Sequence, residues 1–175
     1  DFNVVSKSER KCEIFGWTKI EANKTTVVGY VGTFNRQKRV IDFIDIAHSL
    51  CSDNRLVENI YFVLIGKEGD YSHNFIKDLV LKKNLYPRLK VEGYKENIIP
   101  WYEAIDILIA PAENEGFGRN IVEAMDRSSV VVASRSGAHP EIVTHMETGL
   151  LVEVGDIEQY VASLKAIVDS ETLRN

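Results

Sequence analysis

Two glutamates flank a glycine-rich turn in the segment 113–125, which reads ENEGFGRNIVEAM. Glu115 stands at the start of the turn, and Glu123 is expected inside the helix that follows, so both can face one cleft. A carboxylate only accepts hydrogen bonds and can hold two neighbouring hydroxyls, as sugar and ribose rings present them. Backbone N–H groups at a helix start attract anions. The residues placed to offer such groups are Gly116, Phe117, Gly118, Arg119 and Asn120. These residue types predict a phosphorylated ligand that contains a sugar.

Apolar periodicity predicts the elements that position this segment. Six short runs rich in branched residues are expected to form strands: 25–32, 60–66, 89–93, 106–111, 130–134 and 150–154. Amphipathic stretches between them are expected to form helices: 39–50, 73–84, 97–105, 118–125 and 156–168. This alternation predicts an α/β fold, a parallel sheet of about six strands with helices on both faces. In such a sheet ligands bind at the carboxyl ends of the strands, where the glutamate-rich segment begins.

The composition is that of a folded domain. The 175 residues, 45% hydrophobic and 27% charged, suit one domain, expected over residues 25–175 after a polar linker or edge segment over 1–24. A net charge of −5 without a basic stripe argues against nucleic-acid binding. Cys12 and Cys51 have neither disulfide nor metal-ligand spacing, so we expect a reducing compartment, the cytoplasm.

Several other chemistries lose support from missing motifs. Gly66-Lys67 is followed by Glu68, so there is no Walker A sequence, and no G-x-G-x-x-G follows the first expected strand. The chain has no D-x-D pair, and its four histidines lack H-x-x-x-H spacing, so we expect no metal. Nucleotide hydrolysis and nicotinamide binding are therefore disfavoured.

Three motifs carry a family resemblance: the E-x7-E pair within EGFGRNIVEAM, then GAHPEIV at 137–143 and TGLLVEVGD at 148–156. In this order they resemble the donor-binding half of GT-B retaining glycosyltransferases of the GT4 type, the glycosyl transferases group 1. The resemblance covers about residues 27–168. It implies a Rossmann-like domain that binds a UDP-sugar or GDP-sugar and needs no cofactor or metal. It also implies an N-terminal acceptor-binding domain that this chain lacks, so the chain alone is expected to be inactive.

The resemblance implies roles for single residues. Glu115 would hold hydroxyls of the transferred sugar, and Lys38 would neutralise the diphosphate, which makes these two the catalytic candidates. Glu123 would bind the ribose. Simpler roles remain open: Glu123 as the surface partner of Arg119 four residues away, Glu115 as a carboxylate favoured by the helix dipole, and Lys38 as a solvated lysine.

The ends of the bound nucleotide are expected to lie at other loops. Gly66 closes the second strand, where it faces the nucleotide or only forms a tight turn. The resemblance places the base beside Tyr94 and Lys95, and a plain core or rim position is the open alternative for Tyr94. The family often has an arginine where this chain has Thr33, so that phosphate contact is either missing or made by Arg36. An ordinary surface arginine is the open alternative for Arg36.

The whole protein is then expected to move a sugar from a nucleoside diphosphate to a glycan or lipid-linked acceptor in polysaccharide biosynthesis. Any contact with the inner face of a membrane would be made through the missing half. Two alternatives share the fold: a nucleotide-sugar 2-epimerase and a non-catalytic nucleotide-binding module. Product analysis with the donor alone would identify the epimerase, because epimerisation needs no acceptor. A donor-binding titration would test the non-catalytic module, because a domain that has kept only the fold need not bind nucleotide.

Overall fold

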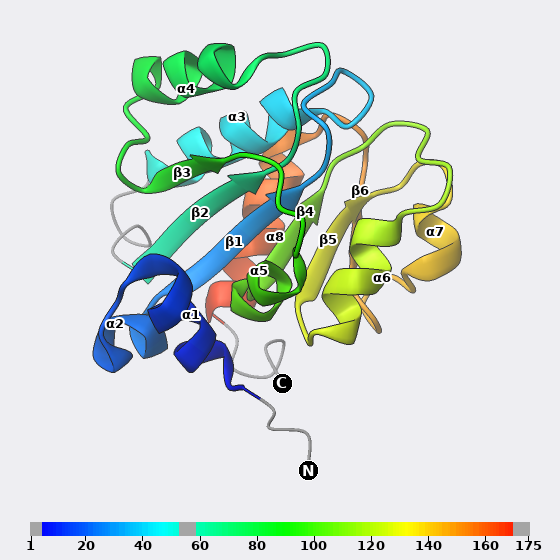
Figure 1. Ribbon diagram of the computed structural model, residues 1–175. Helices are drawn as coiled ribbons and strands as arrows, with labels where there is room; N and C mark the ends of the chain where they lie inside the picture. The colour runs from blue at the N-terminus through cyan, green and yellow to red at the C-terminus, as the bar shows by residue number, and fades with distance from the viewer. Residues whose placement is uncertain (1–4, 53–58, 170–175) are drawn as a thin grey trace.

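The computed structural model describes residues 5–52 and 59–169 and contains one parallel sheet with helices on both faces (Figure 1). The strand order is β3-β2-β1-β4-β5-β6. The strands are β1 (Thr26–Val31), β2 (Ile60–Ile65), β3 (Leu89–Glu92), β4 (Ile107–Ala110), β5 (Val130–Ser134) and β6 (Leu150–Val152). Each lies within one of the runs expected to form strands, so the predicted α/β sheet is confirmed.

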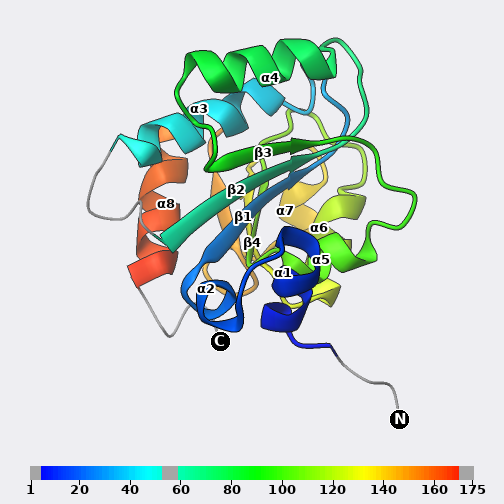
Figure 2. The ribbon, with the colours of Figure 1, turned by 60° about the vertical axis from the view of Figure 1, so that its left-hand side comes forward.

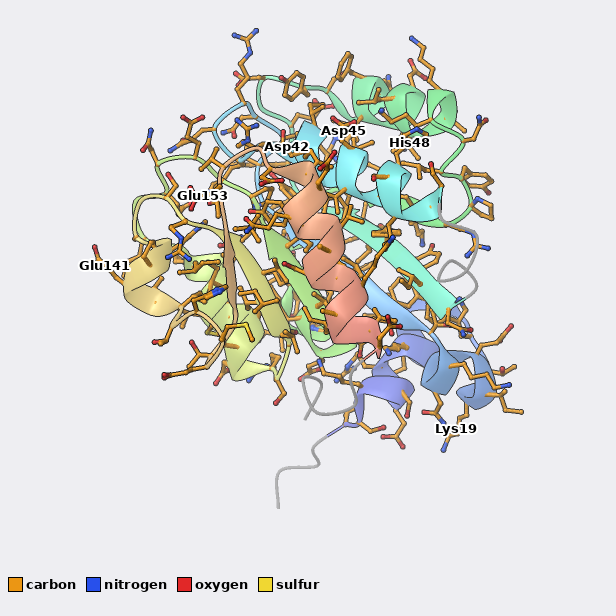
Figure 3. All side chains as sticks on the ribbon, turned by 180° about the vertical axis from the view of Figure 1, so that it is seen from behind. Lys19, Asp42, Asp45, His48, Glu141 and Glu153 are labelled. Atoms are coloured by element: carbon orange, nitrogen blue, oxygen red, sulfur yellow. The ribbon has the colours of Figure 1, made fainter. Side chains whose placement is uncertain are left out.

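Helices cover both faces of the sheet. One face carries α3 (Val40–Cys51), α4 (His73–Lys82) and α8 (Ile157–Asp169), and from behind α8 and α3 lie side by side (Figure 3). The other face carries α1 (Lys7–Phe15), α5 (Ile99–Ala104), α6 (Arg119–Asp126) and α7 (His139–Ile142). A short helix, α2 (Lys19–Lys24), joins α1 to β1 (Figure 2). The five helices predicted from amphipathic periodicity all form, with ends shifted by a few residues.

Alternate side chains of the strands enter two separate cores. In β1, Val28 and Tyr30 pack with α3 and α8, whereas Val27 packs with α5 and α6. All three side chains are buried. Because both faces of the sheet are covered, the strands read as continuous apolar runs rather than alternating ones.

The N-terminal segment differs from the expected linker or edge segment. Its described part forms α1 and α2, and α1 packs against α5. Ser6 and Glu9 form a capping box at the start of α1. Lys11 in α1 is only 5% exposed, and its Nζ lies 2.6 Å from Oδ2 of Asp106. The charged residues of this segment gave no clear helical period in the sequence, because one of them, Lys11, is buried. Residues 1–4 of that segment and 170–175 of the expected domain lie outside the described residues, and the domain boundary stays a prediction.

The strand order places a crevice between β1 and β4. From β1 the chain moves outward to β2 and β3, and it then returns to β4 and continues to β5 and β6 on the other side. The loops that leave β1 and β4 therefore diverge at their carboxyl ends, where open α/β sheets bind ligands. The first of these loops contains Lys38, and the second contains Glu115.

Candidate functional site

An open groove lies at the carboxyl ends of the strands and has two adjoining parts. The part of about 300 Å³ that contains Lys38 and Glu115 is here called the Lys38 pocket. The part of about 310 Å³ that contains Gly66 and Tyr94 is called the Tyr94 pocket. The residues that line both parts are Val31, Gly32, Thr33, Tyr102, Arg119 and Glu123. Most of the residues predicted from the sequence are thus brought together along one groove.

Lys38 and Glu115 form an ion pair in the Lys38 pocket. The turn after β1 presents Lys38, whose backbone N–H donates to Oδ1 of Asn35 at 2.7 Å. The Glu115 side chain is only 13% exposed. Burial alone would raise the pKa of this carboxyl group. The hydrogen bond and charge of Lys38, with the backbone N–H groups of Gly118 and Phe117, outweigh that effect and lower the pKa. Glu115 is therefore an anion that can accept hydrogen bonds from hydroxyl groups.

The loop between β5 and α7 holds the backbone of Glu115 in place. The N–H of Ala138 donates to the carbonyl of Glu115 at 2.8 Å, and the N–H of Asn114 donates to Oγ of Ser136 at 3.0 Å. Gly137 has φ of +57°, and a Cβ there would lie 2.3 Å from the carbonyl oxygen of Glu115. Only glycine fits at this position without displacing Glu115.

His139 and Glu141, in α7, lie outside the groove. His139 is buried, and its Nδ1 lies 2.9 Å from Oγ of Ser134. Burial is the main cause that lowers the pKa of this imidazole. Glu141 points away from the molecule at its outer edge (Figure 3). Neither side chain lines the groove.

The start of α6 brings Glu123 and Asn120 to the groove. Gly118, with φ of +73°, turns the chain into the helix, and Nδ2 of Asn120 donates to the carbonyl of Val31 at 3.1 Å. Arg119 lies 3.3 Å from Glu123, but its side chain is 81% exposed. The surface pair with Arg119, which the sequence suggested as a simpler role for Glu123, is therefore present. Exposed pairs of this kind are weak, so the contact leaves Glu123 able to bind a ligand.

The Tyr94 pocket lies where the ends of β1 and β2 meet. A Cβ on Gly66 would lie 1.7 Å from the carbonyl oxygen of Gly32, so only glycine allows this approach. Tyr94 is 68% exposed. Nζ of Lys95 lies 2.6 Å from Oε2 of Glu92 and 4.6 Å from the centre of the Trp101 ring. This end thus offers an exposed aromatic ring and backbone groups for a flat base.

Not every predicted residue lines the groove. Gly116, Gly118 and Arg36 are absent from its lining. The two glycines belong to the turn before α6, whereas Arg36 is exposed and its backbone N–H donates to Asp70 at 2.8 Å. The phosphate role of Arg36 stays a prediction. Sequence reasoning missed Tyr102, which lines both pockets, because an aromatic residue on an amphipathic helix reads as core.

The sequence and the fold were compared with those of known proteins. Residues 13–175 match the family model of glycosyl transferases group 1. The chain belongs to this family. The C-terminal domain of the group 1 protein LpcC from Francisella tularensis is 28% identical, with a TM-score of 0.72 over 85% of this chain and 78% of that one. The match confirms that this chain is the C-terminal domain of a GT-B glycosyltransferase.

Other relatives extend the comparison. A Rhizobium meliloti lipopolysaccharide core mannosyltransferase, LpsB, is 38% identical over 54% of this chain and 27% of its own. An Escherichia coli UDP-Gal:alpha-D-GlcNAc-diphosphoundecaprenol galactosyltransferase is 26% identical over 97% of this chain and 42% of its own. Anabaena Alr3699/HepE in complex with UDP has the same fold, with 22% identity and a TM-score of 0.79 over 96% of this chain and 44% of that one. This group 1 chain therefore spans less than half the length of these relatives. Within the described residues, none of the helices has the length and apolar character needed to cross a bilayer.

Proposed function

We propose that this group 1 chain binds the nucleotide-sugar donor for a GT4-type retaining glycosyltransferase. The observation that carries this proposal is the convergence of Lys38, Glu115 and Glu123 on one groove at the strand crevice. The three residues come from the loop after β1, the loop after β4 and the helix α6. A cation and two carboxylates along a groove suit a ligand that contains phosphate between two sets of hydroxyl groups.

The donor is proposed to lie along the groove with its base in the Tyr94 pocket and its sugar in the Lys38 pocket. Glu123 lines both parts and would accept hydrogen bonds from the ribose. Glu115 would accept them from the sugar, and Lys38 would contact the diphosphate as well as Glu115. The backbone N–H groups at the start of α6 would add further contacts to phosphate.

In the proposed reaction the nucleoside diphosphate leaves while positive charge develops on the sugar. The contribution of this domain is to orient the donor and to stabilise the negative charge on the leaving phosphates. Lys38 supplies the positive charge that stabilises these phosphates. Glu115 holds the sugar so that the bond to the diphosphate faces the acceptor. The acceptor would be held by another domain of the protein, and no metal is required in this scheme.

The acceptor is proposed to be a glycan or a lipid-linked sugar. Two relatives support this class: one is named for the lipopolysaccharide core, and the other for a diphosphoundecaprenol substrate. We infer a role in polysaccharide biosynthesis in the cytoplasm, with any membrane contact made outside this chain.

A thermal-shift panel of UDP-sugars and GDP-sugars tests the proposal. A ligand present at 100 times its Kd stabilises a protein by about 2.7 kcal/mol, which is readily measured. One base and one sugar should give a clear increase in Tm. No increase with any nucleotide or nucleotide sugar would contradict the proposed function.

A further inference from the structure

One basic side chain among the described residues lies at the junction of the two pockets. Among the described lining residues, Lys38 lines only the Lys38 pocket, and Lys67 and Lys95 line only the Tyr94 pocket. Arg119 is the basic residue that lines both. In a nucleoside diphosphate sugar the diphosphate lies between the ribose and the sugar, so its charge would fall at this junction. Thr33, which also lies there, offers only a neutral hydroxyl group.

Arg119 is held loosely in its present position. Its Nη2 contacts Oε1 of Glu123 at 3.3 Å, a pair between neighbouring turns of α6, and its side chain is 81% exposed. A long, exposed arginine side chain loses little when it leaves such a contact. A diphosphate offers a stronger, charge-assisted and often bidentate partner.

Tyr102 is placed to replace Arg119 as the partner of Glu123. Tyr102 is 1% exposed, and its hydroxyl group lies beside Glu123 but has no hydrogen bond of standard geometry to any of the described residues. Burial is the main cause that raises its pKa, and the charge of Glu123 and a hydrogen-bonding contact with that carboxylate raise it further. The hydroxyl group therefore stays protonated and can donate. A buried donor whose contact falls short of good geometry is unfavourable, which indicates that the bond to Glu123 is completed in another state of the groove.

We propose that nucleotide binding exchanges the partners of Glu123. Arg119 leaves Glu123 and contacts the diphosphate at the junction of the two pockets. The hydroxyl group of Tyr102 then donates to Glu123 and orients its carboxylate toward the ribose. Arg119 is thus a binding residue, and Tyr102 is a positioning residue. This inference rests on the proposed function, because it takes a nucleoside diphosphate as the ligand of the groove.

Calorimetric titration of the chain with UDP and GDP, and with uridine and guanosine, tests the role of Arg119. Arg119→Ala should weaken binding of the diphosphate that the wild type prefers by roughly tenfold or more. Binding of the matching nucleoside should stay unchanged or become slightly tighter, because Arg119 no longer competes for Glu123. Arg119→Lys should recover part of the diphosphate affinity. Arg135→Ala is the matched control, since Arg135 is also exposed and paired, 3.2 Å from Glu153, but does not line the groove.

The role of Tyr102 is tested with a variant that keeps its ring. Tyr102→Phe should keep the stability of the domain and weaken binding of both nucleoside and diphosphate by about three- to tenfold. Combined with Glu123→Gln it should add no further loss, because the two side chains act as one unit. Tyr160→Phe is the matched control: Tyr160 is also buried, its hydroxyl group also has no hydrogen bond of standard geometry to the described residues, and it does not line the groove.

The outcomes separate this inference from the proposed function. If the wild type binds a diphosphate but Arg119→Ala binds it equally well, or loses nucleoside affinity to the same extent, the exchange is wrong and the proposed function stands. Tyr102→Phe that binds like the wild type, or losses that add to those of Glu123→Gln, would also overturn the exchange. A wild-type chain that binds neither UDP nor GDP would contradict both.

Discussion

The ammonium group of Lys38 is paired with the carboxylate of Glu115, although the two residues are 77 positions apart. The sequence suggested a separate partner for each: the diphosphate for Lys38 and the sugar for Glu115. The ion pair shows that the loops after β1 and β4 meet at the crevice. One cation therefore holds the Glu115 carboxylate in its charged form and lies in the same pocket.

The two glutamates are expected to bind different parts of the donor. Glu123→Ala should weaken binding of both UDP or GDP and the matching nucleotide sugar, because the ribose is common to both ligands. Glu115→Ala should weaken only the additional affinity contributed by the sugar. Loss of a charged hydrogen-bond acceptor costs about 1.5–3 kcal/mol, and calorimetry resolves this difference. Equal losses for both ligands in both variants would contradict the division.

Acid should weaken the contribution of Glu115 to stability. The native pKa of Glu115 is lower than its ordinary value of 4.5, so the pair stabilises the fold fully above that pH and less as the pH falls through the native pKa. The difference in unfolding free energy between the wild type and Glu115→Gln should be constant near neutral pH and shrink in acid. Denaturant titrations between pH 7 and pH 3 measure this, and a difference that grows in acid would refute the assignment.

Gly137→Ala should displace Glu115. Alanine at φ of +57° costs roughly 1–2 kcal/mol, and contact with the Glu115 backbone at 2.3 Å should add about 1–3 kcal/mol. Gly16→Ala is the control, because Gly16 has φ of +71° but no atom within 4 Å of the added Cβ. Chemical denaturation should show the larger loss for Gly137→Ala, together with weaker binding of the nucleotide sugar. Equal losses of unfolding free energy in the two variants would contradict this prediction, because the loop would then accommodate the added methyl group at no further cost.

Lys11→Ala should detach α1 from the sheet. Nζ of Lys11 contacts Asp106 at 2.6 Å and donates to the carbonyl of Thr25 at 2.9 Å. Removing Lys11 leaves Asp106, whose side chain is 23% exposed, without its ion-pair partner, and we expect a loss of about 1–3 kcal/mol in unfolding free energy. Lys24→Ala, at an exposed position of α2, should change stability little. A similar small effect in Lys11→Ala would mean that α1 is not part of the folded domain.

The sheet was predictable because its strands are buried on both faces. Val27 and Val28 enter different cores, and both are fully buried, so consecutive apolar residues were a sufficient signal. In α1 the decisive residue is Lys11, whose burial depends on Asp106 at the distant start of β4. No pattern of neighbouring residues in the sequence predicts such a pairing.

The candidate site was predictable where glycines and carboxylates mark the ends of strands. Glu115 and Glu123 line the groove as expected. Arg36 was predicted to contact phosphate because it is close to Lys38 in the sequence, but its side chain does not line the groove. Tyr102 was missed because burial and an unsatisfied hydroxyl group are properties of the packed fold rather than of a motif.

The central claim is that the groove binds a nucleoside diphosphate sugar. Two-dimensional NMR of the isotopically labelled chain, titrated with UDP-sugars and GDP-sugars, tests it most directly. The claim predicts saturable changes in the amide signals of Gly32 and Thr33, of Gly66, and of residues 116–120 at the start of α6. Signals that stay constant with every donor, or that change only on surfaces away from the groove, would contradict it.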